Sequence, residues 1–202
     1  MTTLPPPAGE RSVRDRLDEI VQEYRQVGDV PRLLDRVTRL AREAPTDALV
    51  PAADAHRELH EVAGPIFEVV VEREPANVRA LVGLANAYWL TGRGPDVVGA
   101  LASRAIAADP ASRAAWHLWA LTEQTPRGRV RRWQQVTDRF PDDLLAKVNL
   151  ADNAAAVAGA DDDPVALKTA ISTYESLLAA ATQPAQRAAL EQALRALRAR
   201  RD

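Results

Sequence analysis

Apolar residues recur every three or four positions along most of this chain, which is the spacing of amphipathic helices. Pro75, Pro110 and Pro141 each follow one such apolar stretch and precede another. The three prolines lie 35 and 31 residues apart, close to the roughly 34-residue period of stacked helix–turn–helix repeats. The pattern predicts an all-α superhelix (solenoid) of about five antiparallel helix pairs followed by a C-terminal capping helix.

Capping residues and helix breakers set the expected helix bounds. Ser12, Asp29, Asn77, Thr125 and Asp163 stand where N-caps are expected, and prolines follow several of them in the first helical turn. We expect helices over about 12–28, 29–44, 47–61, 62–74, 77–92, 95–109, 112–124, 125–140, 144–158, 164–181 and 184–202. They would form a single domain over residues 11–202, preceded by a disordered arm over residues 1–10.

The apolar stripes also predict which faces are buried. In the second helix, Leu33, Leu34, Val37 and Leu40 should face the core. Trp116 and Trp119 should share one buried seam, and Trp133 should point inward. Tyr88 and Trp89 are adjacent, so they cannot both enter the same core layer, and we expect one of them to border a binding surface.

Residues placed after Pro75 carry a family resemblance. Counting from Pro75, the sixth position holds a large residue, Leu81, and the ninth holds a leucine, Leu84. The tenth position holds a small residue, Ala85, and the thirteenth an aromatic residue, Tyr88. After Pro110 the first three match as Trp116, Trp119 and Ala120, but Glu123 replaces the aromatic residue. This pattern resembles the tetratricopeptide repeat (TPR) family with degenerate repeats, most closely over residues 63–141.

The resemblance implies a protein or peptide partner bound in a concave groove, with no catalysis by the chain itself. In the family, the first helix of each pair lines that groove. The corresponding positions here are Arg79, Val82, Asn86 and Trp89 in one repeat and His117, Leu121 and Gln124 in the next. Asn86 would hold the backbone of an extended peptide, or it would be an ordinary solvated side chain.

A metal site is one alternative function. His56 and His60 are four residues apart, which would place both imidazoles on one face of a helix and could chelate zinc or nickel. His117 is the only other histidine in the sequence, so a third ligand is hard to find, and a pair of surface histidines is the plainer interpretation. Asp163 explains the run of three aspartates as an N-cap better than a calcium loop does. We expect no cofactor.

Nucleic-acid binding and enzyme activity are two further candidate functions. Arginines cluster at residues 127–132, beside Trp133, and again at residues 195–201. They could neutralise phosphates, or they could be the polar faces of helices, and the net charge of −2 provides no general attraction for nucleic acid. No linear catalytic motif is present, although a groove could still assemble a helical enzyme site.

The remaining features of the composition argue against disulfide-bonded, membrane-spanning and secreted proteins. There is no cysteine, so disulfides and thiolate metal sites are excluded. No apolar run reaches the roughly 18 residues of a membrane span, and the N-terminus does not have the pattern of a secretory signal. We therefore expect a cytoplasmic protein. Its Ala/Arg-rich composition is typical of proteins encoded by bacterial genomes rich in G and C. A solenoid with open ends could also form a homo-oligomer.

Overall fold

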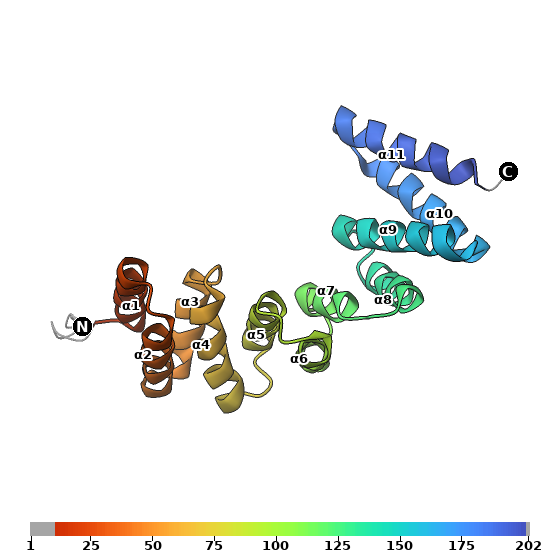
Figure 1. The fold of residues 1–202 in the computed structure, drawn as a ribbon. Helices are drawn as coiled ribbons and strands as arrows, with labels where there is room; N and C mark the ends of the chain where they lie inside the picture. The colour runs from red at the N-terminus through yellow and green to blue at the C-terminus, as the bar shows by residue number, and fades with distance from the viewer. Residues whose placement is uncertain (1–10, 201–202) are drawn as a thin grey trace, which may run out of the picture. The chain divides into compact units, whose positions relative to one another are not determined.

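The computed structural model describes residues 11–200, and helices are the only regular elements in that range. The helices are α1 (Val13–Val27), α2 (Val30–Glu43), α3 (Thr46–Ala55), α4 (His60–Arg73), α5 (Val78–Leu90), α6 (Pro95–Ala108), α7 (Arg113–Leu121), α8 (Pro126–Arg139), α9 (Leu144–Asp161), α10 (Pro164–Ala180) and α11 (Pro184–Arg198) (Figure 1). The predicted all-α class, the five helix pairs and the additional C-terminal helix are confirmed.

The chain divides into two compact units, Met1–Ser112 with α1–α6 and Arg113–Asp202 with α7–α11. The predicted single domain over residues 11–202 stays a prediction. The predicted disordered arm, residues 1–10, lies outside the described residues.

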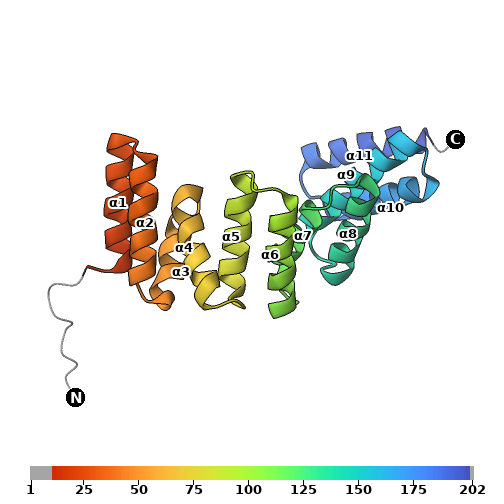
Figure 2. The same ribbon diagram turned by 60° about the horizontal axis from the view of Figure 1, so that its bottom comes forward.

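In the first unit, helices α1–α5 each pack against the other helix of their pair and against a neighbouring pair, and α6 packs against α5. α1 packs against α2 and α3, α2 packs against α4, and α5 packs against α4 and α6. Figure 2 shows the three helix pairs of this unit following one another in chain order. Large side chains of all six are buried between the helices, among them Leu17, Val37, Leu49, Phe67, Leu81 and Val98. Each pair therefore depends on its neighbours to cover its apolar face.

In the second unit, α7 packs on α8, α8 on α9, α9 on α10 and α10 on α11. Trp133 and Val136 of α8 form one cluster with Leu150 of α9. The half-buried rings of Trp116 and Trp119 pack against this cluster. The two rings meet edge to face, with their centroids 5.5 Å apart. Leu194 and Leu197 of α11 cover residues of α9 and α10. The C-terminal helix thus acts as a cap on this unit, as predicted.

Six helices, α1, α2, α5, α8, α9 and α10, begin where a side chain accepts a hydrogen bond from one of their first N–H groups. Ser12 and Asp15 form a reciprocal capping box at α1. Asp29, Asn77 and Thr125 each accept a hydrogen bond from a backbone N–H three residues later. Capping therefore explains why the predicted N-termini of α1, α2, α5 and α8 match the structure.

Arginines of later helices satisfy carbonyl groups at the ends of earlier ones. Arg73 at the end of α4 donates to Ala44 O at 2.7 Å and to Arg42 O at 2.6 Å. Arg104 of α6 donates to Pro75 O at 3.0 Å, just beyond α4. The last carbonyls of a helix have no partner within that helix. These arginines therefore link successive pairs through groups that would otherwise need water.

The boundary between the third and fourth helices was predicted wrongly. The prediction placed it at residues 61–62, next to Gly64 and Pro65. In the structure α3 ends at Ala55 and α4 begins at His60, with Pro65 inside it. Val62 is fully buried in the first turn of α4, so packing of that turn outweighs the helix-breaking tendency of the proline.

Three smaller predictions were also wrong. α9 continues to Asp161, beyond the predicted end at residue 158. Leu34 was expected in the core but is 37% exposed, because α2 turns Leu33 and Val37 inward instead. α7 ends at Leu121, so Gln124 lies in the turn that follows the helix.

Gly83 of α5 tests how tightly the helix pairs pack. A Cβ at this position would lie 2.5 Å from Cζ of the buried Phe67 ring of α4. Gly83→Ala should therefore lower the free energy of unfolding by about 1–2 kcal/mol, although alanine is the better helix former. The measurement is urea denaturation followed by circular dichroism.

Gly64→Ala is the matched control. A Cβ there would meet only Ala87 Cβ at 3.6 Å, an ordinary contact. This variant should be as stable as the parent chain or more stable by about 0.5–1 kcal/mol. Equal stability of the two variants would contradict the packing described between α4 and α5.

Candidate partner-binding surfaces

The predicted partner-binding residues of the first unit follow one face of α5. Arg79, Asn86 and Trp89 are exposed, and Val82 is half-buried. The Trp89 side chain leaves 40% of its surface in contact with solvent. We call Val82, Asn86 and Trp89 the α5 surface.

Tyr88, next to Trp89, is turned toward the scaffold. Its hydroxyl donates to Glu68 Oε1 of α4 at 2.6 Å, and the guanidinium of Arg93 lies 5.3 Å from its ring centroid. Burial and the hydrogen bond to Glu68 raise the pKa of Tyr88 to about 12, so the phenol stays a donor. The prediction that one aromatic packs while the other stays outside is confirmed, with Trp89 as the exposed one.

Asn86 differs from other asparagines of the chain in having a free amide. Within the described residues its side chain makes no hydrogen bond. Asn77 is bonded to Glu74 and to Ala80 N–H, whereas Asn149 and Asn153 donate to carbonyls of their own helix. The Asn86 amide can therefore offer its donors and its acceptor to another molecule.

Arg79 already has a partner within the first unit. It forms an ion pair with Asp54 of α3, and His56 Nε2 lies 2.6 Å from Asp18 Oδ1 of α1. Two polar contacts thus join α5 to α3 and the end of α3 to α1. Because Arg79 serves this purpose, we leave it out of the α5 surface.

The predicted histidine pair for a metal site does not form. His56 follows the end of α3 and His60 is the first residue of α4, so the prediction that they share one helix face is wrong. The boundary error described above is the cause. No group of three or more potential ligands gathers anywhere in residues 11–200.

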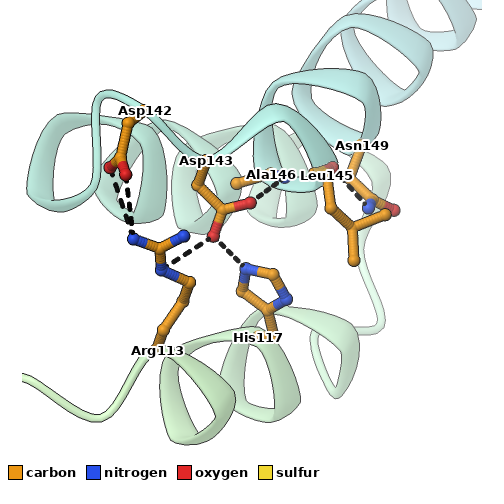
Figure 3. A network of polar contacts seen from close by, with 7 residues as sticks. All are labelled: Arg113, His117, Asp142, Asp143, Leu145, Ala146 and Asn149. Atoms are coloured by element: carbon orange, nitrogen blue, oxygen red, sulfur yellow. Dashed lines mark hydrogen bonds and ion pairs between the residues drawn. The ribbon is translucent and has the colours of Figure 1, made fainter.

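In the second unit, His117 belongs to a polar network between α7 and the start of α9 (Figure 3). Its Nε2 lies 2.7 Å from Asp143 Oδ2. The other carboxylate oxygen of Asp143 accepts a hydrogen bond from Ala146 N–H at 3.0 Å, which caps α9. Arg113 completes the network, with Nε 3.6 Å from Asp143 and Nη2 3.2 Å from Asp142.

These contacts set the charge of Asp143, whose side chain is 4% exposed. Burial alone would raise its pKa, but the Ala146 N–H, His117 and Arg113 outweigh burial and lower the pKa below its ordinary value. His117 is thus engaged in holding α7 to α9, and its ring stacks edge to face on Trp133. Among the predicted partner-binding residues, His117 makes the most contacts with other side chains of the protein.

Leu121 and Gln124 are more accessible than His117. Leu121 is 40% exposed at the end of α7, and Gln124 is exposed in the turn beyond it, with a side chain that makes no hydrogen bond to the described residues. The sequence analysis missed Leu144, Leu145 and Val148, which are exposed in the first turns of α9. Counting seven positions from Pro141, as was done for Pro75 and Pro110, would have found Val148.

Within the described residues, four of the seven arginines in the two clusters pair with acids, and Arg129, Arg131 and Arg195 form no ion pair there. Arg127 contacts Asp161 at 3.1 Å and Asp163 at 3.3 Å. Arg132 pairs with Glu123 and Arg198 with Glu175. These guanidinium groups therefore have carboxylate partners where a nucleic-acid surface would need free cations.

No helix within residues 11–200 has the length and hydropathy of a membrane span.

Asp143→Asn should separate the charge of Asp143 from its capping role, because asparagine caps helices equally well. At neutral pH the variant should lose about 1–2 kcal/mol of unfolding free energy, since His117 and Arg113 lose an anionic partner. The folded pKa lies below the ordinary 3.8. The contribution of the carboxylate is therefore present above that value and is lost as pH falls through the folded pKa.

The measurement is urea denaturation of both chains at pH 7 and at about pH 3. Asp142→Asn is the control, because Asp142 is 77% exposed and its ion pair should contribute little. A difference between the parent chain and Asp143→Asn that is the same at both pH values would contradict this role for the charge.

Comparison with known proteins agrees with this architecture. No protein-family model matches the sequence, and no curated protein matches it either. Solved structures do match. TTC0263, a TPR protein of Thermus thermophilus, is 16% identical with a TM-score of 0.54, over 92% of this chain and 98% of that one. PilF of Pseudomonas aeruginosa is 14% identical with a TM-score of 0.63, over 94% and 86%.

YrrB, described as a TPR protein with an unusual peptide-binding site, is 16% identical with a TM-score of 0.53, over 79% of this chain and 87% of that one. At these identities the similarity concerns the fold. The helix pairs and their stacking within each unit agree with the fold of these solved TPR structures. The chain has the fold of a tetratricopeptide-repeat-like helical solenoid with degenerate repeats.

Proposed function

We propose that this chain is a protein-interaction scaffold that holds a peptide or a segment of a partner protein on the α5 surface, with no catalysis of its own. The observation that carries the proposal is the side-by-side placement of an exposed tryptophan and a free asparagine amide. Trp89 is 40% exposed although its neighbour Tyr88 is packed. Asn86 lies three residues earlier on the same helix.

These two side chains suit complementary parts of a peptide. A large rigid ring that loses solvent on binding is a typical anchor of a protein interface. The amide of Asn86 can donate to a peptide carbonyl and accept from a peptide N–H. The aliphatic Val82, one turn before Asn86, extends the apolar part of the surface. An extended segment with an apolar side chain opposite Trp89 fits this arrangement.

Similarity to other proteins supports the same kind of function. YrrB is described as having a peptide-binding site on a TPR fold, and a related use of this fold here is part of the proposal. The ion pairs of the arginine clusters disfavour nucleic-acid binding, and the separation of His56 from His60 disfavours a metal site.

Trp89→Ala should weaken peptide binding much more than folding. The probe is a peptide of about 12 residues, selected on the purified chain from a random display library. Its affinity should fall by about 30-fold or more, as expected for a tryptophan anchor, because much of the ring lies outside the protein core. Fluorescence anisotropy with the labelled peptide gives the dissociation constant, and thermal unfolding gives the stability.

Two controls accompany this variant. Trp133→Ala, which removes a ring that is only 2% exposed, should cost about 3–5 kcal/mol of unfolding free energy. Val165→Ala, at a 73% exposed position of α10, should change neither quantity. If Trp89→Ala destabilises the chain as much as Trp133→Ala, Trp89 is a core residue and not an anchor. If no peptide is selected, the proposed function is wrong.

Asn86→Ala should reduce affinity for the same peptide about tenfold through the loss of hydrogen bonds to its backbone. Stability should stay the same or rise by about 0.5 kcal/mol, because alanine is the better helix former. Asn149→Ala is the matched control, since that amide is bonded to Leu145 O of its own helix. An Asn86→Ala chain that binds the peptide as tightly as the parent would identify Asn86 as an ordinary solvated residue.

A further inference from the structure

A groove with a volume of about 330 Å³ lies between α10 and α11 of the second unit. Figure 1 shows α11 at the edge of that unit, packed on α10. The apolar side chains that line the groove are Leu178 and Ala179 of α10 and Leu194 of α11. Leu194 is only 2% exposed and Leu178 is half-buried. We call this feature the α10–α11 groove.

Two arginines that line the groove already have partners within the unit. Arg198 pairs with Glu175 of α10 at 2.7 Å. Arg187 donates to Leu178 O and to Ala181 O, both at 3.1 Å. These two side chains thus fasten α11 to the end of α10, and their charges are accounted for by contacts inside the protein.

Two other charged residues of the groove are left without a partner. Glu191 and Arg195 of α11 line it and are exposed, and neither side chain forms a hydrogen bond or ion pair with the described residues. They are four positions apart and therefore lie on the same face of the helix. An acid followed by a base at this spacing can pair within a helix, but here the two groups stay apart. The groove thus offers one anion and one cation side by side.

This pair of charges is self-complementary. An α11 helix of a second copy, laid antiparallel across the groove with the two-fold axis near residue 193, faces Glu191 with Arg195 of the other chain. The symmetry repeats the contact, so that both carboxylates and both guanidinium groups find a partner. A different protein would need the same acid and base in the same order, whereas a second copy carries them automatically.

The other arginines of the groove do not oppose this alignment. It brings Arg187 opposite Ala199 of the second copy and Arg198 opposite Ala188. Both alanines are exposed, and their small side chains leave room for the arginine stems. No two like charges of α11 meet, which matters because like charges placed opposite each other across an interface are strongly unfavourable.

We propose that the α10–α11 groove is a dimer interface, in which α11 of a second copy of this chain covers Leu178 and Leu194. α11 has 15 residues and is therefore about 22 Å long. Two helices present less area than a standard interface of about 800 Å² per partner. The dimer is accordingly weak and reversible, with a dissociation constant on the order of 10 µM. The contact is isologous and closes at two copies.

Charge reversal tests this interface in the full chain. Glu191→Arg places two cations opposite each other at both contacts, and Arg195→Glu places two anions there. Each single variant should raise the dissociation constant of the dimer about tenfold or more. The double variant Glu191→Arg/Arg195→Glu restores both pairs and should dimerise within about threefold of the parent chain. Sedimentation equilibrium over about 1–200 µM measures these constants, since that range brackets the expected value.

A mixture of the two single variants provides an independent rescue. Each chain then supplies the charge that the other needs, so heterodimers should form with about the affinity of the parent dimer. Glu58→Arg is the matched control, because it makes the same charge change at an 87% exposed side chain of the first unit. It should leave the dissociation constant unchanged. Circular dichroism should show the same helix content in every variant, since all of these positions are exposed.

Each other outcome overturns the proposal. A parent chain that stays monomeric up to about 200 µM has no such interface. A dimer that both single variants preserve uses another surface. Weakened single variants that neither the double variant nor the mixture rescues show that Glu191 and Arg195 do not face each other. The inference does not depend on the proposed function, because the α5 surface lies in the first unit and peptide binding should be the same in all of these variants.

Discussion

Each helix pair of this protein buries an apolar face that the pair beside it must cover. In the first unit the Phe67 ring of α4 fills the space above Gly83 of α5 so closely that a single methyl group would not fit. In the second unit the Trp133 cluster joins α8 to α9, and α11 covers what α10 would otherwise expose. Because apolar side chains are buried between neighbouring pairs, the outer face of the first helix in a pair is left free to bind. The proposed binding residues lie on such faces.

Polar contacts add specificity to this packing. They repeat one principle, in which a side chain of one helix satisfies backbone groups or charges of another. Arg73 does this at the end of α2, Asp143 at the start of α9, and Arg132 at the end of α7. Because arginine supplies several donors in a plane, one residue can bind two carbonyls or combine a carbonyl with a carboxylate. This use gives the arginine-rich composition a role in holding helix ends.

Local signals in the sequence were sufficient for most of the architecture. Capping at Ser12, Asp29 and Asn77 depends only on neighbouring residues, and the positions of the helix starts follow from it. The boundary near Pro65 could not be obtained in this way, because the burial of Val62 against distant residues decides it. The loss of the predicted histidine pair follows from that one error.

The candidate site was predictable in part for the same reason. Helical periodicity allowed only one of Tyr88 and Trp89 to pack, and the bond from Tyr88 to Glu68 settles which. That bond joins residues 20 positions apart, so no local pattern reveals it. Likewise, Glu123 departs from the repeat pattern in the sequence, but that pattern does not reveal its ion pair with Arg132.

The central claim is that the stacked helices present Trp89 and Asn86 as a preformed binding face. A crystal structure of the chain with a display-selected peptide tests it most directly. The account predicts a peptide that covers the Trp89 ring and bonds its backbone to the Asn86 amide, on an α4–α5–α6 stack that is unchanged. A peptide bound to the opposite faces of α2, α4 or α6, with Trp89 still in solvent, would contradict it.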